Sequence, residues 1–160
     1  MRLPATLIAA SLFFAPGIAA AQSAITLKDP KAFEQQLTEM GYAPEPFGAG
    51  TDTVETVLHL PNETLGVVLA GCTNGKGCTY AVLLGSFSDL HEVPADWVTK
   101  MNVNFDLIKV WVRDDKKLAY SAGAIIEGLP RSTFRAWVEN IVDSSNSLAN
   151  EAIKAGLIAK

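Results

Sequence analysis

The sequence predicts an α+β fold in which an antiparallel sheet of about five strands is flanked by helices, in the order α-β-β-β-α-β-β-α. Three observations support this prediction. Apolar residues recur at helical spacing in two long segments, β-type runs fill the region between them, and short polar turns join those runs into antiparallel pairs. Helices with one apolar stripe would cover a face of such a sheet, which makes the fold a layered sandwich.

Local start and stop signals delimit the elements. The first helix can be capped by Asp29, can carry Pro30 at its first position, and can end at Gly41. The last helix contains weak helix formers in its C-terminal part, so we expect it to fray from about residue 146. The expected elements are a helix over 27–42, strands over 53–60, 64–72 and 78–87, a short helix over 94–101, strands over 105–113 and 118–126, and a long helix over 130–153.

Residues 1–21 have the pattern of a cleaved signal peptide. Arg2 gives a positive start, residues 3–14 are almost wholly apolar, and Ala19 and Ala21 meet the small-residue rule of signal peptidase. A retained membrane anchor is the competing interpretation, but the apolar run is too short to span a bilayer comfortably. We therefore expect one mature domain over residues 22–160, periplasmic or secreted by a bacterium, with no stable membrane anchor.

The charge balance argues against nucleic acid as a partner. The chain carries −4 at neutral pH, and removal of Arg2 with the leader leaves 12 basic and 17 acidic residues, about −5. Nucleic-acid phosphates require a basic patch, and the sequence shows none. An acidic domain also has no electrostatic reason to bind an anionic membrane surface.

The only two cysteines, Cys72 and Cys78, flank a glycine-rich turn. An export signal with an even cysteine count predicts a disulfide in an oxidising compartment, here one that staples a β-hairpin. A redox role is the first alternative, although it would favour C-x-x-C spacing at a helix N-terminus. A zinc site is the second, and it would need His59 and His91 as its further ligands.

No catalytic constellation is visible. His91-Glu92 lacks the second histidine of a zinc-protease helix, and Gly85-Ser86 lacks the second glycine of a nucleophile elbow. We therefore expect no catalytic residues, no metal ligands and no cofactor, and we expect that the protein is not an enzyme.

The predicted strand 105–113 is the candidate binding face. One of its sides is apolar and typical of a core. The other side mixes aromatic residues with cations: Phe105, Leu107, Lys109, Trp111 and Arg113. If a helix covers that side, Trp111 is a core residue with the two cations at its edge. If nothing covers it, Phe105, Lys109, Trp111 and Arg113 form a binding face for an acidic or aromatic partner.

Several of these features together resemble the YbjN-domain family, especially its secreted, cysteine-containing members. They are the order of elements, the Gly71-Cys72…Cys78 hairpin, Asn102 and Asn104 before a strand, and the amphipathic helix after Gly128. The resemblance covers about residues 27–145. It implies a fold like that of the type III secretion chaperones, a role in regulating sensory transduction, and pairing into homodimers.

The leading functional hypothesis is a non-catalytic periplasmic protein that binds another protein, as a regulatory or chaperone-like module. It depends on the absence of catalytic motifs and on the fold that the resemblance implies. The alternative is a carrier of a small molecule or lipid, with a pocket between the sheet and the helices that contain Trp97 and Trp137.

Overall fold

The computed structural model describes residues 24–88 and 90–157, so the signal peptide expected over residues 1–21 lies outside the described residues. The described chain forms three helices and six strands, which confirms the α+β class. In chain order they are α1 (Pro30–Glu39), β1 (Ala43–Pro44), β2 (Thr53–His59), β3 (Thr64–Ala70), β4 (Tyr80–Phe87), α2 (Ala95–Asn104), β5 (Lys109–Val112), β6 (Leu118–Ala124) and α3 (Arg131–Lys154).

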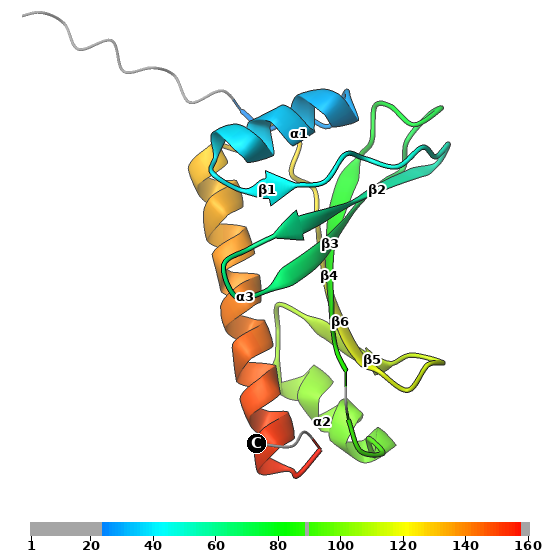
Figure 1. The fold of residues 1–160 in the computed structure, drawn as a ribbon, viewed down its shortest axis with the longest axis vertical. Helices are drawn as coiled ribbons and strands as arrows, with labels where there is room; N and C mark the ends of the chain where they lie inside the picture. The colour runs from blue at the N-terminus through cyan, green and yellow to red at the C-terminus, as the bar shows by residue number, and fades with distance from the viewer. Residues whose placement is uncertain (1–23, 89, 158–160) are drawn as a thin grey trace, which may run out of the picture.

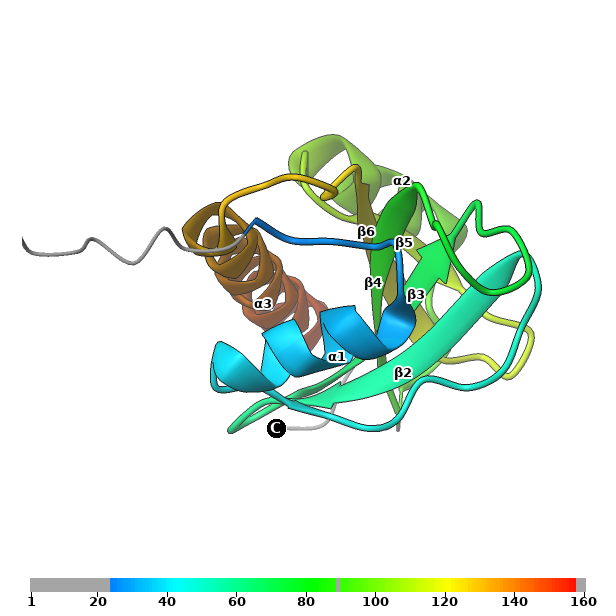
Figure 2. The same ribbon diagram turned by 90° about the horizontal axis from the view of Figure 1, so that it is seen from above.

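All six strands belong to one antiparallel sheet with the order β1-β2-β3-β4-β6-β5. The sixth strand, which the sequence did not predict, is the two-residue β1. Helices α1 and α3 lie on one face of the sheet, and α2 lies at the end of the sheet near β5 (Figures 1 and 2). Among the described elements no helix lies over the opposite face, which we call the open face.

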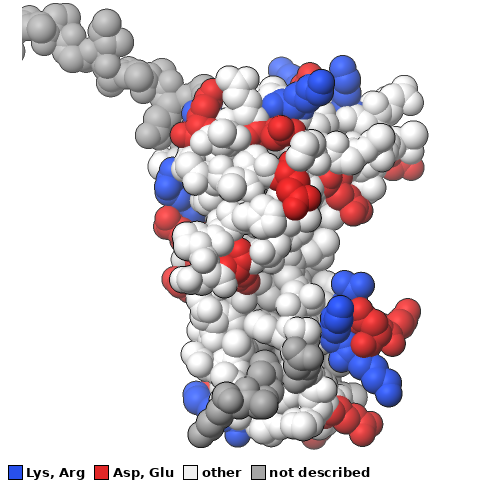
Figure 3. Space-filling view, in the orientation of Figure 1, with Lys and Arg blue, Asp and Glu red and all other residues white. Residues whose placement is uncertain are grey.

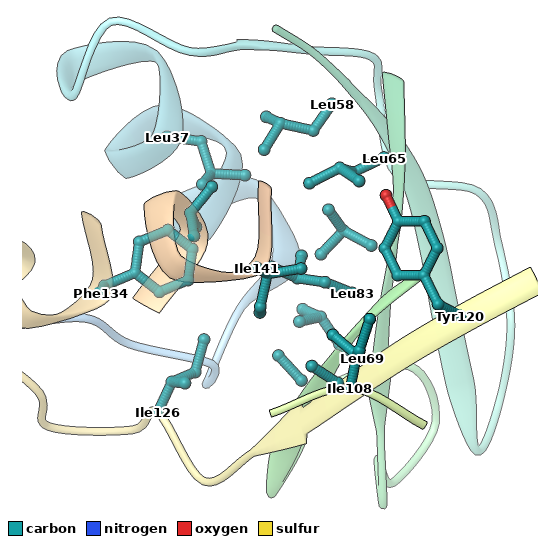
Figure 4. Close-up of a cluster of buried hydrophobic side chains, with 14 of the residues drawn as sticks. Leu37, Leu58, Leu65, Leu69, Leu83, Ile108, Tyr120, Ile126, Phe134 and Ile141 are labelled. Carbon is teal, nitrogen blue, oxygen red and sulfur yellow. The ribbon is translucent and has the colours of Figure 1, made fainter. Parts of the chain in front are cut away.

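The core fills the space between the sheet and the two helices α1 and α3. Along β2 and β3 every second residue is buried, so one side of each strand faces the helices and the other faces outward. Leucines dominate the sheet side of this core, and Phe33, Phe134 and Ile141 contribute from the helices. Figure 4 shows these side chains converging from both layers.

Helix α1 has the cap and the terminating glycine that its sequence predicts, but it covers Pro30–Glu39 and is shorter than the expected range 27–42. The Asp29 side chain accepts a hydrogen bond from the Lys31 N–H at 3.1 Å, and Pro30 occupies the first helical position. Gly41 follows the helix with a φ of 86°, a left-handed conformation that glycine adopts without steric cost. The chain can therefore turn sharply into β1, which lies beside β2.

Helix α3 agrees with the long helix expected over 130–153, and it is helical beyond residue 146, where the sequence had suggested fraying. The helix continues to Lys154, and Leu148 and Ala152 are both fully buried. Burial of an apolar stripe stabilises a helix more than the weak propensity of a few serine and asparagine residues destabilises it. In the described part of the chain, none of the helices combines the length and apolarity that crossing a bilayer requires.

Candidate functional site

The cysteine hairpin is a structural staple. Cys72 and Cys78 form a disulfide with an S–S distance of 2.07 Å, as the sequence predicted. Between them, Asn74 and Gly75 have φ values of 51° and 71° at the two central positions of a tight turn. Asn-Gly in this conformation is the preferred sequence of a type I′ hairpin turn. Both cysteines are buried, and no free thiol is left for redox chemistry.

The staple also holds residues 24–28, which we call the N-terminal strap. The Cys78 N–H donates to the Leu27 carbonyl at 3.1 Å, and the Gly77 N–H donates to the Lys28 carbonyl at 3.0 Å. On its other side, the Ile25 N–H donates to the Leu129 carbonyl at 2.8 Å. Ile25 and Leu27 are buried in the core. The disulfide loop therefore holds the strap in place through backbone hydrogen bonds.

The two histidines lie in ordinary surface positions. His59 Nε2 lies 2.9 Å from Glu45 Oε1, and both side chains are about half exposed. His91 is exposed, and its backbone N–H donates to the Leu157 carbonyl. Within residues 24–88 and 90–157, no three His, Cys, Asp or Glu residues lie close enough together to hold a metal ion.

One buried polar cluster was missed by the sequence reasoning. The Tyr120 hydroxyl donates to Glu63 Oε1, and the Ser145 hydroxyl donates to the same oxygen at 2.8 Å. Burial and the hydrogen bond to Glu63 together raise the pKa of Tyr120, because both favour the neutral phenol. The cluster joins β6, the β2–β3 turn and α3. No local pattern marks it, because its members are far apart in the sequence.

Strand β5 divides its side chains between the two faces of the sheet. Val110 is buried in the core, whereas Lys109 and Trp111 lie on the open face. The strand begins at Lys109 and not at residue 105, because α2 continues to Asn104. Phe105 is the C-cap of α2 and packs against the core, so it does not share a face with Trp111. Arg113 follows the strand and is about half exposed.

The strand register brings Trp111 beside residues of three other strands. One row of paired residues crosses the open face from β3 through β4 and β6 to β5. It consists of Gly66, Leu84, Ser121 and Lys109. In the next row, Ser86 pairs with Ala119 and Ala119 with Trp111. Between these rows the surface is hollowed by about 550 Å³, lined by Thr64, Gly66, Leu84, Gly85, Ser86, Trp111, Arg113 and Ala119. We call this space the Trp111 hollow.

The outline of the molecule is concave on the side of the sheet away from α3 (Figures 1 and 3). In Figure 3 the right-hand edge is indented between the upper part of the sheet and the charged turn that joins β5 to β6. That turn carries both signs of charge. Arg113 Nε lies 3.4 Å from Asp115 Oδ1, and Lys117 Nζ lies 3.6 Å from Asp115 Oδ2. Both ion pairs are exposed to solvent and weak.

A second hollow, of about 450 Å³, lies on the helical side, between α3 and the β2–β3 turn. Apolar side chains of Leu60, Val138 and Val142 form part of its wall, and Glu63, Glu139 and Asp143 contribute carboxylates. Arg135 also lines it, but the guanidinium donates to the Met40 carbonyl at 2.6 Å and lies over the Tyr42 ring. Trp97 and Trp137 do not line this hollow but pack against the core.

Part of the backbone at each end of the sheet is already hydrogen-bonded. At the β5 edge, the Asn102 side chain accepts from the Val110 N–H and donates to the Val110 carbonyl, each at 2.8 Å. At the other end of the sheet, β1 and the residues after it cover β2: the Glu45 and Gly48 N–H groups donate to the carbonyls of Val57 and Glu55, each at 2.8 Å. A further strand cannot be added at these positions without displacing groups that are already bonded.

Comparison of the chain with protein-family models, with characterised proteins and with solved structures returned no match.

Proposed function

We propose that the protein is a non-catalytic, exported module that binds another protein on the open face of its sheet. One observation carries the proposal: the middle of the open face holds a group of apolar side chains from β2, β3 and β4, with polar side chains such as Glu55 and His59 at its margin, and no described helix lies over it (Figure 1). Val57, Val68, Val82 and Leu84 are half-buried side chains on that face. A solvent-facing side of an antiparallel sheet is normally polar, so an apolar one indicates a contact surface.

The partly bonded edges of the sheet support docking on the face. Many peptide-binding domains add the peptide as a further strand at a free sheet edge. Here Asn102 occupies the backbone of Val110 at one edge, and residues 43–48 occupy the other. These contacts make edge pairing less favourable and favour side-chain contacts on the open face.

Export is part of the same proposal. Its supports are the leader-like sequence of residues 1–21 and the Cys72–Cys78 disulfide, a bond that persists in oxidising compartments.

Site-specific photo-crosslinking tests the proposal. A photoreactive phenylalanine analogue would replace Val82 or Ser121 on the open face, and Ala136 or Asn150 on the exposed side of α3 as matched controls. In periplasm, we expect one crosslinked protein of the same identity from both open-face positions and none from the α3 positions. Crosslinks that form only on α3, or none at any position, would contradict an open-face binding function.

The second candidate function is a small-molecule carrier, and the hollow beside α3 favours it. Its volume of about 450 Å³ is within the range of ligand pockets, and its walls combine apolar and charged groups. Native mass spectrometry of gently purified protein tests it. A bound small molecule that is lost when Val142→Trp, at a half-buried position of the wall, fills the hollow would support the carrier function over the protein-binding one.

A further inference from the structure

The floor of the Trp111 hollow is made of residues that lack side-chain bulk. Gly66 on β3 and Ala119 on β6 lie beneath it, and the Trp111 ring forms one wall. Thr64 and Ser86 add hydroxyl groups at its margin. The hollow therefore exists because the strand register places small residues, glycine and alanine, near the large Trp111 side chain.

Neither the backbone nor the packing requires glycine at position 66. Its φ is not in the left-handed region, and an added Cβ would lie 3.5 Å from Leu84 Cβ, an ordinary contact distance. Glycine inside a strand makes the folded state less stable than alanine would at the same position. Such a glycine often marks a place where another molecule approaches the backbone. Gly66 thus reduces stability and keeps the hollow open.

Cations lie on the lining and margin of the hollow, and the nearest carboxylate named by an ion pair is Asp115 in the adjoining turn. Arg113 is the only charged residue among its lining residues, and Lys109 lies one row away on the same face. Within the described residues Lys109 forms no ion pair, and the pair between Arg113 and Asp115 is exposed and weak. The chain as a whole carries −4, so a cationic margin is opposite in sign to the average surface.

We propose that the Trp111 hollow receives an aromatic side chain of a partner protein, with an acidic residue of the partner beside it. This inference rests on the proposed function and names the partner's chemistry. The aromatic ring packs against the Trp111 ring over the Gly66 floor, an arrangement that aromatic pairs favour. The neighbouring carboxylate pairs with the Arg113 guanidinium, whose planar fork suits a carboxylate.

Short peptides serve as probes in an NMR titration of the isotopically labelled protein. The test peptide is acetyl-Asp-Phe-Asp-amide. One control peptide replaces both aspartates with lysine, and the other replaces phenylalanine with alanine. We expect the test peptide to shift the amide signals of Gly66, Leu84 and Trp111, and to bind at least about tenfold more tightly than either control, which is about 1.4 kcal/mol.

Three variants locate the binding. Gly66→Val fills the hollow and suits a strand, so the melting temperature should be unchanged or higher while affinity for the peptide falls at least about tenfold. Arg113→Gln should weaken binding by about three- to tenfold and reduce its dependence on salt. Lys76→Gln makes the same charge change in the cysteine hairpin and should leave binding unchanged. If Gly66→Val lowers the melting temperature, Gly66→Ala replaces it, with a smaller expected loss.

The inference is overturned if the test peptide shifts no open-face signal, if the Gly66 variant binds it as tightly as wild type, or if the lysine peptide binds equally well. A positive crosslink at Val82 together with any of these results would leave the binding function standing and reject only this partner chemistry. Failure of both experiments would reject the function as well.

Discussion

Replacement of Gly85 by alanine should destabilise the protein strongly, for a reason specific to one cross-strand pair. Gly85 on β4 is paired with Tyr120 on β6, and the Tyr120 side chain crosses directly over it on the core side. A Cβ at position 85 would lie 2.5 Å from Tyr120 Cε1 and closer still to Cζ and the hydroxyl oxygen. Real Cβ atoms do not approach other heavy atoms so closely, so the ring has to move.

The cost follows from what the ring would lose. Tyr120 is 1% exposed, so it has no solvent into which it can swing, and overpacking of a core typically costs about 1–3 kcal/mol. Displacement of the ring also breaks the hydrogen bond from its hydroxyl to Glu63, worth about 1.5–3 kcal/mol when the acceptor is charged. Replacement of a strand glycine by alanine by itself stabilises the folded state by about 0.5–1 kcal/mol, which offsets part of this loss. We therefore expect a net loss of about 2–5 kcal/mol.

Urea denaturation measures this loss as a lower midpoint at an unchanged slope. Gly123→Ala is the matched control, since its added Cβ would lie 3.7 Å from Val82 Cγ2, and its stability should stay within about 0.5 kcal/mol of wild type. In a Tyr120→Leu background, Gly85→Ala should cost less than about 1 kcal/mol, because the clashing atoms are absent. Equal costs in the two backgrounds, or a harmless Gly85→Ala, would refute the reasoning.

Three other predictions concern the staple, the buried tyrosine and the sheet edge. Replacing Cys72 and Cys78 by serine should lower stability by about 2 kcal/mol in the chain-entropy model; a thermal midpoint that is unaffected by both this change and added reductant would contradict it. Because the folded state raises the pKa of Tyr120, its contribution to stability should be complete below about pH 10 and should decline at higher pH; Tyr120→Phe should flatten that decline in a series of urea melts. Asn102→Ala should free the Val110 backbone, cost about 1–3 kcal/mol, and promote edge-to-edge association visible by light scattering, whereas a stable monomer would argue against an edge-protecting role.

The sequence predicted the elements better than it predicted their contacts. Helical periodicity, the Asp29 cap and the glycine-rich turn between Cys72 and Cys78 are local signals, so helix and strand positions could be derived from them. Strand register and cross-strand neighbours depend on packing between distant segments. The pairing of Gly66 with Leu84 and the crossing of Tyr120 over Gly85 therefore had no signature.

The candidate binding face on strand 105–113 was also predicted correctly only where local signals decide the structure. The alternation of residues 108–112 separated the side of Ile108 and Val110, which is buried, from the side of Lys109 and Trp111, but Val112, expected in the core, is 39% exposed at the end of the strand. It could not show that α2 extends far enough to take Phe105 into the core, because helix ends depend on tertiary contacts. Nor could it show which glycines and alanines lie opposite Trp111.

The N-terminal strap has a consequence for the order of folding. Its hydrogen bonds with Gly128 and Leu129 join residues about a hundred positions apart, whereas the Cys72–Cys78 loop closes over a separation of 6. Contacts between distant residues are the slowest to form, so we expect the hairpin to fold early and the strap to dock last. The first described residues of the chain would then complete the native state, and the core would stay open at Ile25 and Leu27 until they arrive.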